Sequence, residues 1–576
     1  MRRCLYVMGS LVASFSGAAN AQSIPLEIQR ESMRIEEREI ERRDALERRL
    51  AESQSPIRDH TPIALEEDRA EADLGCARIR EIRLVGHSLF NTKMFEVEIK
   101  AATGDCVGRT AIRQVERAIT NAYLKRGFIT SRAFAAKAPD AFDVLIVRIV
   151  EGRIDALTSG APVSNRSGKA YGRGALLSAL GNMEGKRLNL RALEQGVDHL
   201  ARLPSGIPTI DIKPSSEPGN SDLVVTRERT ARRLRPSLTT ANGGSRSTGK
   251  EVLTLGIEAD DLIGRADFLS LYLQHDIATG AQRQSQGGGA FFSIPSGRFL
   301  FSVSGNYSEH DSILTSNDLQ FSNTGRSYSG SASIDGLIFR NAKSKFFVTA
   351  QISVLDTETK IQDIRLSVNS YRLVTLTARG RLQSRLGRVR VSADLGYIRG
   401  VRILGASAAD FGPTGPSLEA DKVEAGLSVQ LPIQVGPLRF SAVTSIRGQY
   451  ALDPLLAAER ISIGGEQSVR GYRDDGASGD HGAIARSQVA IPLFTAFRER
   501  APNSGVRFSA SIGHDAGWVW DRASGNRATF LQSAHAGLSL SNARLNGQVV
   551  FAKPLSSLFG VAPRRPEILA SLTVSI

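Results

Sequence analysis

The side chains that could carry out chemistry are few in this chain, and none stands in a catalytic arrangement. His514 and Asp515 are neighbours, which suggests acid–base catalysis, within a stretch of alternating apolar residues. Consecutive side chains of a strand point to opposite faces, however, so these two groups cannot act together. No Ser-His-Asp constellation, metal-ligand spacing or phosphate-binding glycine loop accompanies them. We therefore expect no enzyme, no metal and no cofactor, and we assign His514 to a wall near an interface.

The cysteines predict a disulfide. Residues 1–21 have the features of an export signal: a basic start, a short apolar stretch and small residues at the cleavage positions. An ordinary buried helix is the alternative for this segment. Export removes Cys4 and leaves Cys76 and Cys106 in an oxidising compartment, where a lone pair is expected to be bonded. Two unrelated buried thiols are the alternative, and two cysteines alone leave a metal's coordination shell unfilled.

The elements that position these residues begin with a charged segment at 22–73. Its first part lacks Gly and Pro between residues 30 and 50 and offers i,i+4 pairs such as Glu39–Arg43, so it predicts a helix. A helix that is polar almost all round stands in water, pairs with a partner or fills a polar channel. A linker with two prolines follows.

Two α/β modules are expected next, at 74–152 and 153–229. In the first, a strand at 79–85 precedes apolar residues that recur at helical spacing over 112–123. In the second, the stretch 188–203 predicts a helix of the same kind, and strands flank it on both sides. Each unit has about 75 residues, which suits a compact domain.

From residue 230 to 576, apolar and polar residues alternate with a period of two. Phe301 and Val303 share one face of a predicted strand, and Ser302 and Ser304 share the other. Such stretches of roughly ten residues are typical of an outer-membrane barrel, in which one face meets lipid and the other meets water. At about 22 residues per strand and connection, we expect about sixteen antiparallel strands. A soluble β-sandwich or β-helix is the alternative, which the charged second face and the export signal disfavour.

Composition excludes several other classes of protein. With 41% hydrophobic and 23% charged residues, the chain is neither disordered nor a helical membrane protein. A formal charge of +14 would suit a nucleic-acid binder. The charges are spread along the chain without a basic block that aromatic residues interrupt, so we expect no nucleic-acid partner.

The stretch 463–472, with the sequence IGGEQSVRGY, is the most informative motif. It resembles the signature loop of the Omp85 superfamily, in which a VRGY tetrapeptide lies on a long loop folded back into the barrel lumen. The tetrapeptide consists here of Val469, Arg470, Gly471 and Tyr472. A GxDxG strand motif of the two-partner secretion transporters, the hemolysin activator and filamentous-hemagglutinin transporter family, matches Gly513, Asp515 and Gly517.

The resemblance continues upstream and spans nearly the whole mature chain. Residues 106–132 look like the family's first POTRA domain, and 218–223 resemble the last hairpin of the second. The resemblance implies two periplasmic POTRA domains followed by a transmembrane antiparallel β-barrel at 230–576, with an inward-folded signature loop around 460–483. The charged helix near 24–53 resembles the family's plug helix.

Three positions depart from the family's pattern. Ala241-Asn242 stands where an Asp-Asn pair is usual after the first barrel strand. Arg486-Ser487-Gln488 occupies the place of an acidic position after the signature loop. The sequence ends in Ile576, where an aromatic residue is common, and this bears on insertion into the membrane rather than on the fold.

The alternation over 508–518 directs Asp515 into the lumen, because the apolar residues of that strand occupy the opposite phase. A guanidinium and a carboxylate in a confined lumen each lose hydration, and a forked pair offsets much of that cost. We therefore expect Arg470 to pair with Asp515, Gly471 to allow close backbone approach and Tyr472 to pack against the wall. Separate partners for the two charges are the alternative.

The resemblance implies an outer-membrane translocator of a Gram-negative bacterium, with its POTRA domains in the periplasm. Its partners would be one large secreted exoprotein and outer-membrane lipid, and it would act as a monomer. An Omp85-type assembly factor that inserts other barrels is the first alternative, which the presence of only two POTRA units disfavours. A passive porin or structural barrel is the second, and it leaves the periplasmic modules unexplained.

Overall fold

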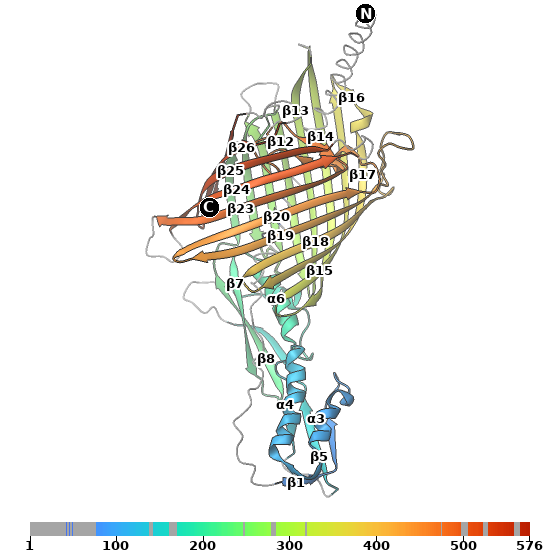
Figure 1. The fold of residues 1–576 in the computed structure, drawn as a ribbon, viewed down its shortest axis with the longest axis vertical. Coiled ribbons are helices and arrows are strands. Elements are labelled where there is room, and N and C mark those ends of the chain that lie inside the picture. The colour runs from blue at the N-terminus through green and yellow to red at the C-terminus, as the bar shows by residue number, and fades with distance from the viewer. Residues whose placement is uncertain are drawn as a thin grey trace, which may run out of the picture.

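The computed structural model describes residues 76–136, 142–160, 170–245, 248–277, 284–316, 319–473, 475–496, 505–521, 528–557 and 565–576, together with Arg42, Ala45, Leu46 and Arg49. The expected export signal at 1–21 and the linker before residue 76 lie outside the described residues. Two small α/β domains are stacked beneath a large barrel (Figure 1). In the described part of the chain, no helix is both long and apolar enough to cross a bilayer.

The first domain packs helices on one face of a three-stranded sheet in the order β2-β5-β4. The core joins Val115, Ile119 and Tyr123 of the long helix to Leu145 and Val147 of the central strand. Its elements are β1 (Cys76–Ile79), β2 (Glu81–Val85), η1 (Thr92–Phe95), α3 (Glu96–Ala101), β3 (Gly104–Gly108), α4 (Arg109–Lys125), β4 (Arg132–Ala135) and β5 (Val144–Val150).

The strand predicted over 79–85 is two strands, and that expectation was wrong. The break falls at Arg80 because β1 pairs with β3 whereas β2 pairs with β5, so the chain changes partners there. Cys76 and Cys106 form a disulfide between β1 and β3. The disulfide therefore joins the two strands of a sheet that is separate from the main sheet of this domain.

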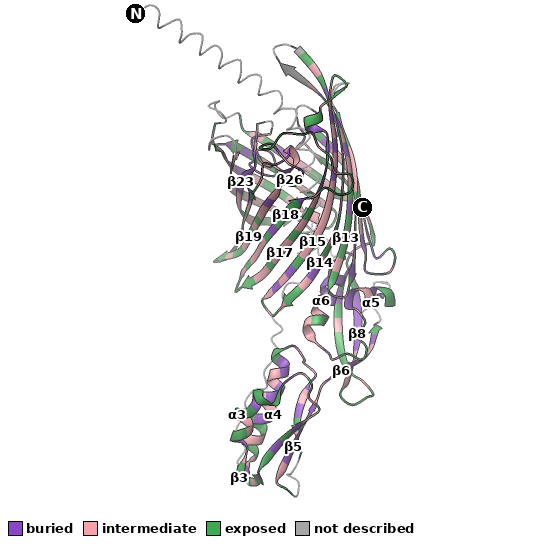
Figure 2. Ribbon diagram, turned by 90° about the vertical axis from the view of Figure 1, so that its right-hand side faces the viewer, coloured by how far each residue is buried: buried purple, intermediate pink, exposed green. Residues whose placement is uncertain are grey.

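The second domain has a sheet in the order β6-β8-β7 and two helices. Asn189 caps the longer helix, and its side chain accepts the N–H groups of Arg191 and Ala192. Figure 2 shows α5 and α6 directly beneath the barrel wall. The domain consists of β6 (Arg153–Ser159), α5 (Arg173–Leu180), α6 (Leu190–Ala201), β7 (Gly206–Pro214) and β8 (Asn220–Arg229). Its apolar core runs without interruption onto Phe268 and Phe291 at the base of the barrel.

Sixteen antiparallel strands close the barrel, as the sequence predicts. Lipid-facing positions carry large exposed apolar side chains such as Val303 and Ile512, whereas the alternate positions are polar. The wall strands are β9 (Leu234–Ala241), β10 (Glu251–Asp260), β11 (Phe268–Ile277), β12 (Gln284–Ser296), β13 (Phe299–Ser316), β14 (Leu319–Arg340), β15 (Ser344–Ile361), β17 (Tyr371–Leu386), β18 (Val389–Gly400), β19 (Asp421–Val435), β20 (Leu438–Ala451), β23 (His481–Ala496), β24 (Val506–Trp520), β25 (Thr529–Ser541), β26 (Leu545–Pro554) and β27 (Glu567–Ser575).

The wall is much taller on one side. A bilayer requires about 9–11 residues of a tilted strand, and β14 has 22 residues whereas β9 has 8. The tall strands β13 and β14 rise above the rest of the barrel at the end opposite the α/β domains (Figure 1). Near that end lie the short strand β16 (Ile364–Arg365) and the turn η2 (Ser367–Asn369). These strands therefore reach well beyond the hydrocarbon on the outer side.

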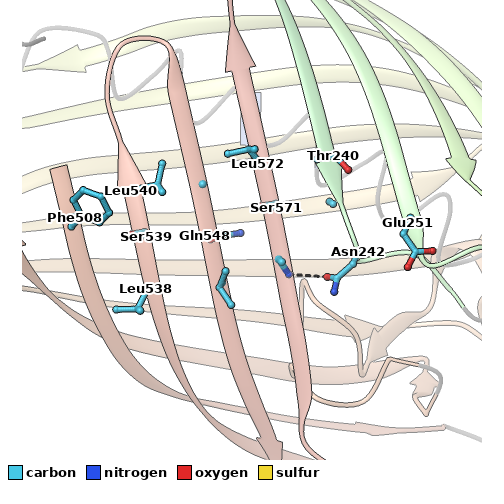
Figure 3. A pocket seen from close by; sticks show the side chains of 14 residues that line it. Thr240, Asn242, Glu251, Phe508, Leu538, Ser539, Leu540, Gln548, Ser571 and Leu572 are labelled. Carbon is cyan, nitrogen blue, oxygen red and sulfur yellow. Dashed lines mark hydrogen bonds between the residues drawn. The ribbon is translucent and has the colours of Figure 1, made fainter. Parts of the chain in front are cut away.

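The barrel closes at a short seam between β9 and β27. Five residue pairs join these strands, compared with eight between β9 and β10. The side chain of Asn242 extends the seam: its Oδ1 accepts the N–H of Ala570 at 2.7 Å, and its Nδ2 donates to the carbonyl of Ile568 at 3.0 Å. Figure 3 shows the first of these bonds at the edge of a largely apolar pocket that β9, β10 and β24 to β27 line. Asn242 is the member of the usual Asp-Asn pair that this chain keeps. Its side chain continues the hydrogen bonding between β9 and β27 beyond the last residue pair.

Candidate functional site

The site is built around Asp515, which the alternation of β24 turns inward. His514 and Ile512 are exposed on the lipid-facing side, whereas the Asp515 side chain is fully buried. Because β24 pairs with β23 on one side and with β25 on the other, Asp515 stands directly opposite Arg486 and Ser533. Its carboxylate is thus surrounded by the lumen-facing side chains of three strands.

Arg470 of the signature loop binds this carboxylate as a fork. Its Nε donates to Oδ2 of Asp515 at 2.7 Å, and its Nη2 donates to Oδ1 at 2.9 Å. The backbone N–H of Arg470 also donates to Oδ2, at 3.3 Å. Two parallel charge-assisted bonds fix direction as well as charge. The structure therefore brings together the two residues that the sequence analysis paired.

The neighbours of Arg470 hold the loop against the wall. Tyr472 is buried, and its hydroxyl lies 2.8 Å from the carbonyl oxygen of Gln532 and accepts the N–H of Ser556 at 3.1 Å. Gly471 has φ +90°, a conformation that favours glycine, and an added Cβ would lie 3.2 Å from Cδ of Pro554. The tetrapeptide is therefore attached to β24, β25 and the end of β26.

A small apolar cluster packs beneath the tetrapeptide. Val469 is fully buried among residues that include Ile463 of the short hairpin β21 (Ile461–Ile463) and β22 (Ala477–Gly479), which follows the turn η3 (Ala457–Glu459). A Cβ on Gly517 would lie 2.8 Å from Cγ2 of Ile463 and 3.0 Å from Cγ2 of Val469. The last glycine of the strand motif therefore leaves space for the loop.

Two further side chains, an arginine and a histidine, approach Asp515 and were not predicted as site residues. Arg486 has its Nε 3.6 Å from Oδ1, and its Nη1 donates to the carbonyl of Gln467 at 2.7 Å. His535 of β25 has its Nδ1 3.8 Å from Oδ2, and a Cβ on Gly513 would lie 2.5 Å from its ring. The alternation of apolar and polar residues indicates that both side chains face the lumen. It does not show that they lie near Asp515, because that depends on the register of the strands. Arg486, noted above as a departure from the family's pattern, thus holds both the carboxylate and the loop backbone.

The signature loop also touches both sides of the closure seam. Arg473 has its Nε 3.9 Å from Oε1 of Glu567, the first residue of β27. On the other side, a Cβ on Gly243, in the turn after β9, would lie 2.1 Å from Oε2 of Glu466. The loop that Asp515 anchors is therefore in contact with the strands that close the barrel.

The four described residues of the 22–73 segment lie in the lumen against β10 and β11. Arg42 donates to Oε1 of Gln274 at 3.1 Å, and its guanidinium carbon lies 4.2 Å from the centre of the Tyr272 ring. Arg49 pairs with Glu258. The positions 42, 45, 46 and 49 share one face of a helix, so this face is the one that meets the wall.

The two α/β domains are joined by an ionic junction at Glu151. Its carboxylate accepts bonds from Oγ of Ser88 at 2.7 Å, from the hydroxyl of Tyr123 at 2.8 Å and from Nε of Arg187 at 2.6 Å. Burial alone would raise the pKa of Glu151, but these bonds outweigh it and lower the pKa to about 2. Glu151 is therefore charged at neutral pH and links residues of both domains.

A second ionic junction fixes α6 to the barrel. Asp198 pairs with Lys345 and Arg340, each at 2.5 Å. The fully buried Arg202 donates to Ser293 and, at 2.7 Å, to the carbonyl of Ala266. Burial lowers the pKa of the neighbouring His199 to about 3, with the nearby Arg202 as a second cause, so this ring is neutral. Buried charges of this kind are strongly destabilising when one partner is removed, so the junction favours a single orientation.

Comparison with known proteins agrees with this architecture. The model of the haemolysin secretion/activation protein ShlB/FhaC/HecB family matches residues 219–540, more than half of the chain. A ShlB-type POTRA domain matches residues 77–152, and a further POTRA domain matches 157–214. The chain belongs to the ShlB/FhaC/HecB family.

Curated relatives extend over nearly the whole chain. The outer membrane transporter CdiB of Dickeya dadantii is 27% identical over 556 residues, which are 96% of this chain and 94% of the relative. The hemolysin transporter protein ShlB of Serratia marcescens is 26% identical and covers 78% of this chain and 80% of its own length. The structure of CdiB from Escherichia coli has a TM-score of 0.82 at 24% identity, over 95% of this chain and 98% of that one, and it supports the fold.

These findings define an outer-membrane transporter of the two-partner secretion class, with its POTRA domains in the periplasm. Its named relatives are transporters and not enzymes. Within the described ranges, no group of three or more His, Cys, Asp or Glu side chains is arranged to hold a metal ion.

Proposed function

We propose that this protein captures an unfolded exoprotein at its POTRA domains and secretes it through the barrel to the cell surface. The client would be a large secreted protein of the hemolysin or hemagglutinin type. The observation that carries the proposal is the combination of a periplasmic arm that offers open strand edges with a barrel whose lumen holds a loop through side-chain contacts. A passive pore would need neither feature.

The strand edges differ in how well they could receive a client. The outer edge of β4 is partly occupied, since the N–H of Ala133 donates to Oγ1 of Thr120 of the neighbouring helix. At β6, the residues after α5 form backbone bonds with Ile154. In the described part of the sheets, β2 and β7 are end strands with one strand neighbour each, and β7 has nine residues.

Strand β7 is therefore the edge best suited to bind an extended client. Backbone hydrogen bonds give affinity that tolerates varied client sequence. Ile207 and Ile212 are exposed along β7 and could add apolar contacts. Because the second domain is fixed to the barrel through Asp198 and Arg202, a client on β7 would be held beside the entrance. Folding of the client outside would then make transport directional, since it removes the unfolded chain from the channel.

The test compares the culture-supernatant and outer-membrane proteomes of cells with and without this protein. Loss of one large secreted protein, with other barrels unchanged, is the expected result and identifies the client. Broad depletion of outer-membrane barrels would instead assign the protein to the assembly factors. No change in either proteome, with the protein and its candidate clients expressed, would contradict both functions.

A further inference from the structure

Where the structure describes them, the periplasmic turns of the barrel expose only positive charge. Six described turns connect wall strands at the rim from which the POTRA domains extend: 261–267, 297–298, 341–343, 387–388, 436–437 and 542–544. Five of them carry an exposed basic residue, namely Arg265, Arg298, Lys343, Arg388 and Arg544. The acidic residues in the six turns are Asp261 and Asp267, and both are buried. We refer to the five exposed residues as the basic rim.

The outer connections differ, since they mix both signs. The connection after β15 carries Asp363 and Arg365, and the one after β18 carries Arg402, Asp410 and Glu419. Several of the outer charges pair with each other, as Arg402 does with Glu419 at 3.0 Å. The described periplasmic turns therefore expose cations alone, whereas the described outer connections carry charges of both signs.

The basic rim lies at the level where the lipid-facing apolar surface ends. Arg298 immediately precedes Phe299, which is exposed on the lipid side as Phe301 is, and its guanidinium carbon lies 5.6 Å from the centre of the Phe299 ring. Arg388 follows the exposed Leu386 at the end of β17. Long basic side chains in such positions place their stems along apolar surface and their charges among the headgroups.

Among the described residues, no carboxylate forms a salt bridge with any member of the basic rim. These cations therefore lack the internal neutralisation seen at Arg235 and Arg340, which pair with Asp260 and Asp198. Unpaired surface cations next to a bilayer attract anionic headgroups.

The turn with Arg265 offers apolar contact as well. Leu262 and Ile263 are 57% and 62% exposed at its tip. The carboxylate of Asp267 accepts the N–H groups of both residues, at 2.9 and 3.2 Å, and thereby holds the tip in one shape. Two aliphatic side chains beside an arginine suit the boundary between headgroups and acyl chains.

We propose that the basic rim binds anionic phospholipids of the periplasmic leaflet. The charge of the rim is complementary to these headgroups, and the rim is continuous with the surface that already faces lipid. Headgroup binding at several turns around the barrel sets its depth and tilt in the membrane. Because α6 is fixed to the same rim through Arg340 and Lys345, the bound lipids also set the height of the periplasmic arm. This inference concerns the membrane and does not depend on the client.

The test uses the full-length protein in nanodiscs that contain phosphatidylglycerol and phosphatidylcholine in equal amounts. The protein is then extracted in mild detergent, and the lipids that stay bound are counted by mass spectrometry. We expect about fivefold enrichment of phosphatidylglycerol, the ratio that one favourable basic contact provides near a membrane. The quadruple variant Arg298→Gln, Lys343→Gln, Arg388→Gln and Arg544→Gln should lose this enrichment.

A matched control removes four positive charges from the outer side: Arg326→Gln, Lys360→Gln, Arg365→Gln and Arg402→Gln. It should retain the enrichment. Equal loss in both variants, or no loss in either, overturns the proposal, because binding would then reflect net charge alone or an unrelated surface. If the rim variant does not insert, the set Arg298→Lys, Arg388→Lys and Arg544→Lys must keep the enrichment, and added salt must abolish it in the unmodified protein. Enrichment that resists salt also overturns the proposal.

Discussion

At the scale of single residues, Asp515 is the point where two arginines and a histidine from different elements meet. Arg470 comes from the loop, Arg486 from β23 and His535 from β25. A buried carboxylate with a forked arginine is directional, so the contact selects one position of the loop. Arg486 adds a second tie, because it also binds the loop carbonyl of Gln467. The carboxylate therefore organises the site, and the loop depends on it.

The first prediction concerns this pair. Asp515→Ala should loosen the loop more than Arg470→Ala does, because it removes the carboxylate from both Arg470 and Arg486, whereas Arg470→Ala leaves Arg486 to neutralise the carboxylate. The double variant should destabilise the loop by less than the sum of the two single variants, with a coupling free energy on the order of 3 kcal/mol. Hydrogen exchange of residues 463–473 in nanodiscs measures the effect.

The control for this cycle is Arg379→Ala. Arg379 is another lumen arginine, and it pairs with Asp394 and Glu424 of the wall and not with the loop. It should leave exchange in the loop unchanged. Strictly additive effects of Arg470→Ala and Asp515→Ala would show that the two residues do not stabilise the loop as a pair. A simple charge swap is unsuitable, since an arginine at 515 would face Arg486.

The second prediction concerns pH and Glu151. Because its folded pKa of about 2 lies below the ordinary value of 4.5, the charged form stabilises the junction above pH 4.5. That stabilisation, about 3 kcal/mol for a shift of this size, is lost as the pH falls from 4.5 towards 2. Hydrogen exchange around Ser88 should rise over this range. In the Glu151→Gln variant, the amides around Ser88 should exchange faster at neutral pH, and their exchange should not rise further as the pH falls from 4.5 towards 2. A rise of equal size in that variant would exclude Glu151 as the cause.

At the scale of elements, the described contacts attach the signature loop at several places. The hairpin β21–β22 and the Val469 cluster support its base, Tyr472 reaches the ends of β25 and β26, and Arg473 approaches β27. The glycines at 513 and 517 leave space for His535 and for the loop. The first POTRA domain shows the same principle, because a covalent link secures the separate sheet of β1 and β3.

The third prediction concerns that disulfide. It joins residues 30 positions apart, and closing a loop of this length contributes on the order of 3 kcal/mol. The double variant Cys76→Ser and Cys106→Ser should therefore make the first domain sensitive to protease. Barrel folding, measured as heat-modifiable migration on gels, should not change. Unchanged protease resistance of residues 76–136 would contradict the prediction.

At the scale of the whole molecule, a rigid series of parts runs from the periplasm to the cell surface. Glu151 joins the two domains, and Asp198 with Arg202 joins the second domain to the barrel. The tall strands β13 and β14 extend the wall on the outer side. Among the described wall strands, the pairing with the fewest residue pairs is the seam, where five pairs and Asn242 close the barrel.

The fourth prediction uses that seam to separate transport from barrel assembly. Thr239 and Thr573 are directly opposite across it, with their hydroxyl oxygens 2.8 Å apart. A disulfide from Thr239→Cys and Thr573→Cys should leave secretion intact, because a client in the lumen does not require the wall to open. Secretion that stops under oxidation and recovers after reduction would show that the seam must part. In the control variant, Thr239→Cys alone, secretion should not change when oxidant is added.

Much of this architecture was predictable because its signals are local. Alternation with a period of two in β13 or β24 reports which side chains meet lipid, so the barrel and the inward direction of Asp515 follow from the sequence. The helices α4 and α6 were predicted for the same reason, from apolar residues at helical spacing. The break at Arg80 was missed, since the pattern of apolar residues along a stretch does not reveal that two short strands pair with different partners.

What the sequence by itself determined is therefore the identity of the elements and the face that each side chain occupies. The tertiary structure alone decided which distant groups meet. Arg486 and His535 reach Asp515 through the registers of β23 and β25, Glu151 gathers partners from two domains, and the turns align their cations along one rim. Register and domain packing depend on contacts between segments far apart in the chain, and a local pattern of polarity carries no information about those contacts.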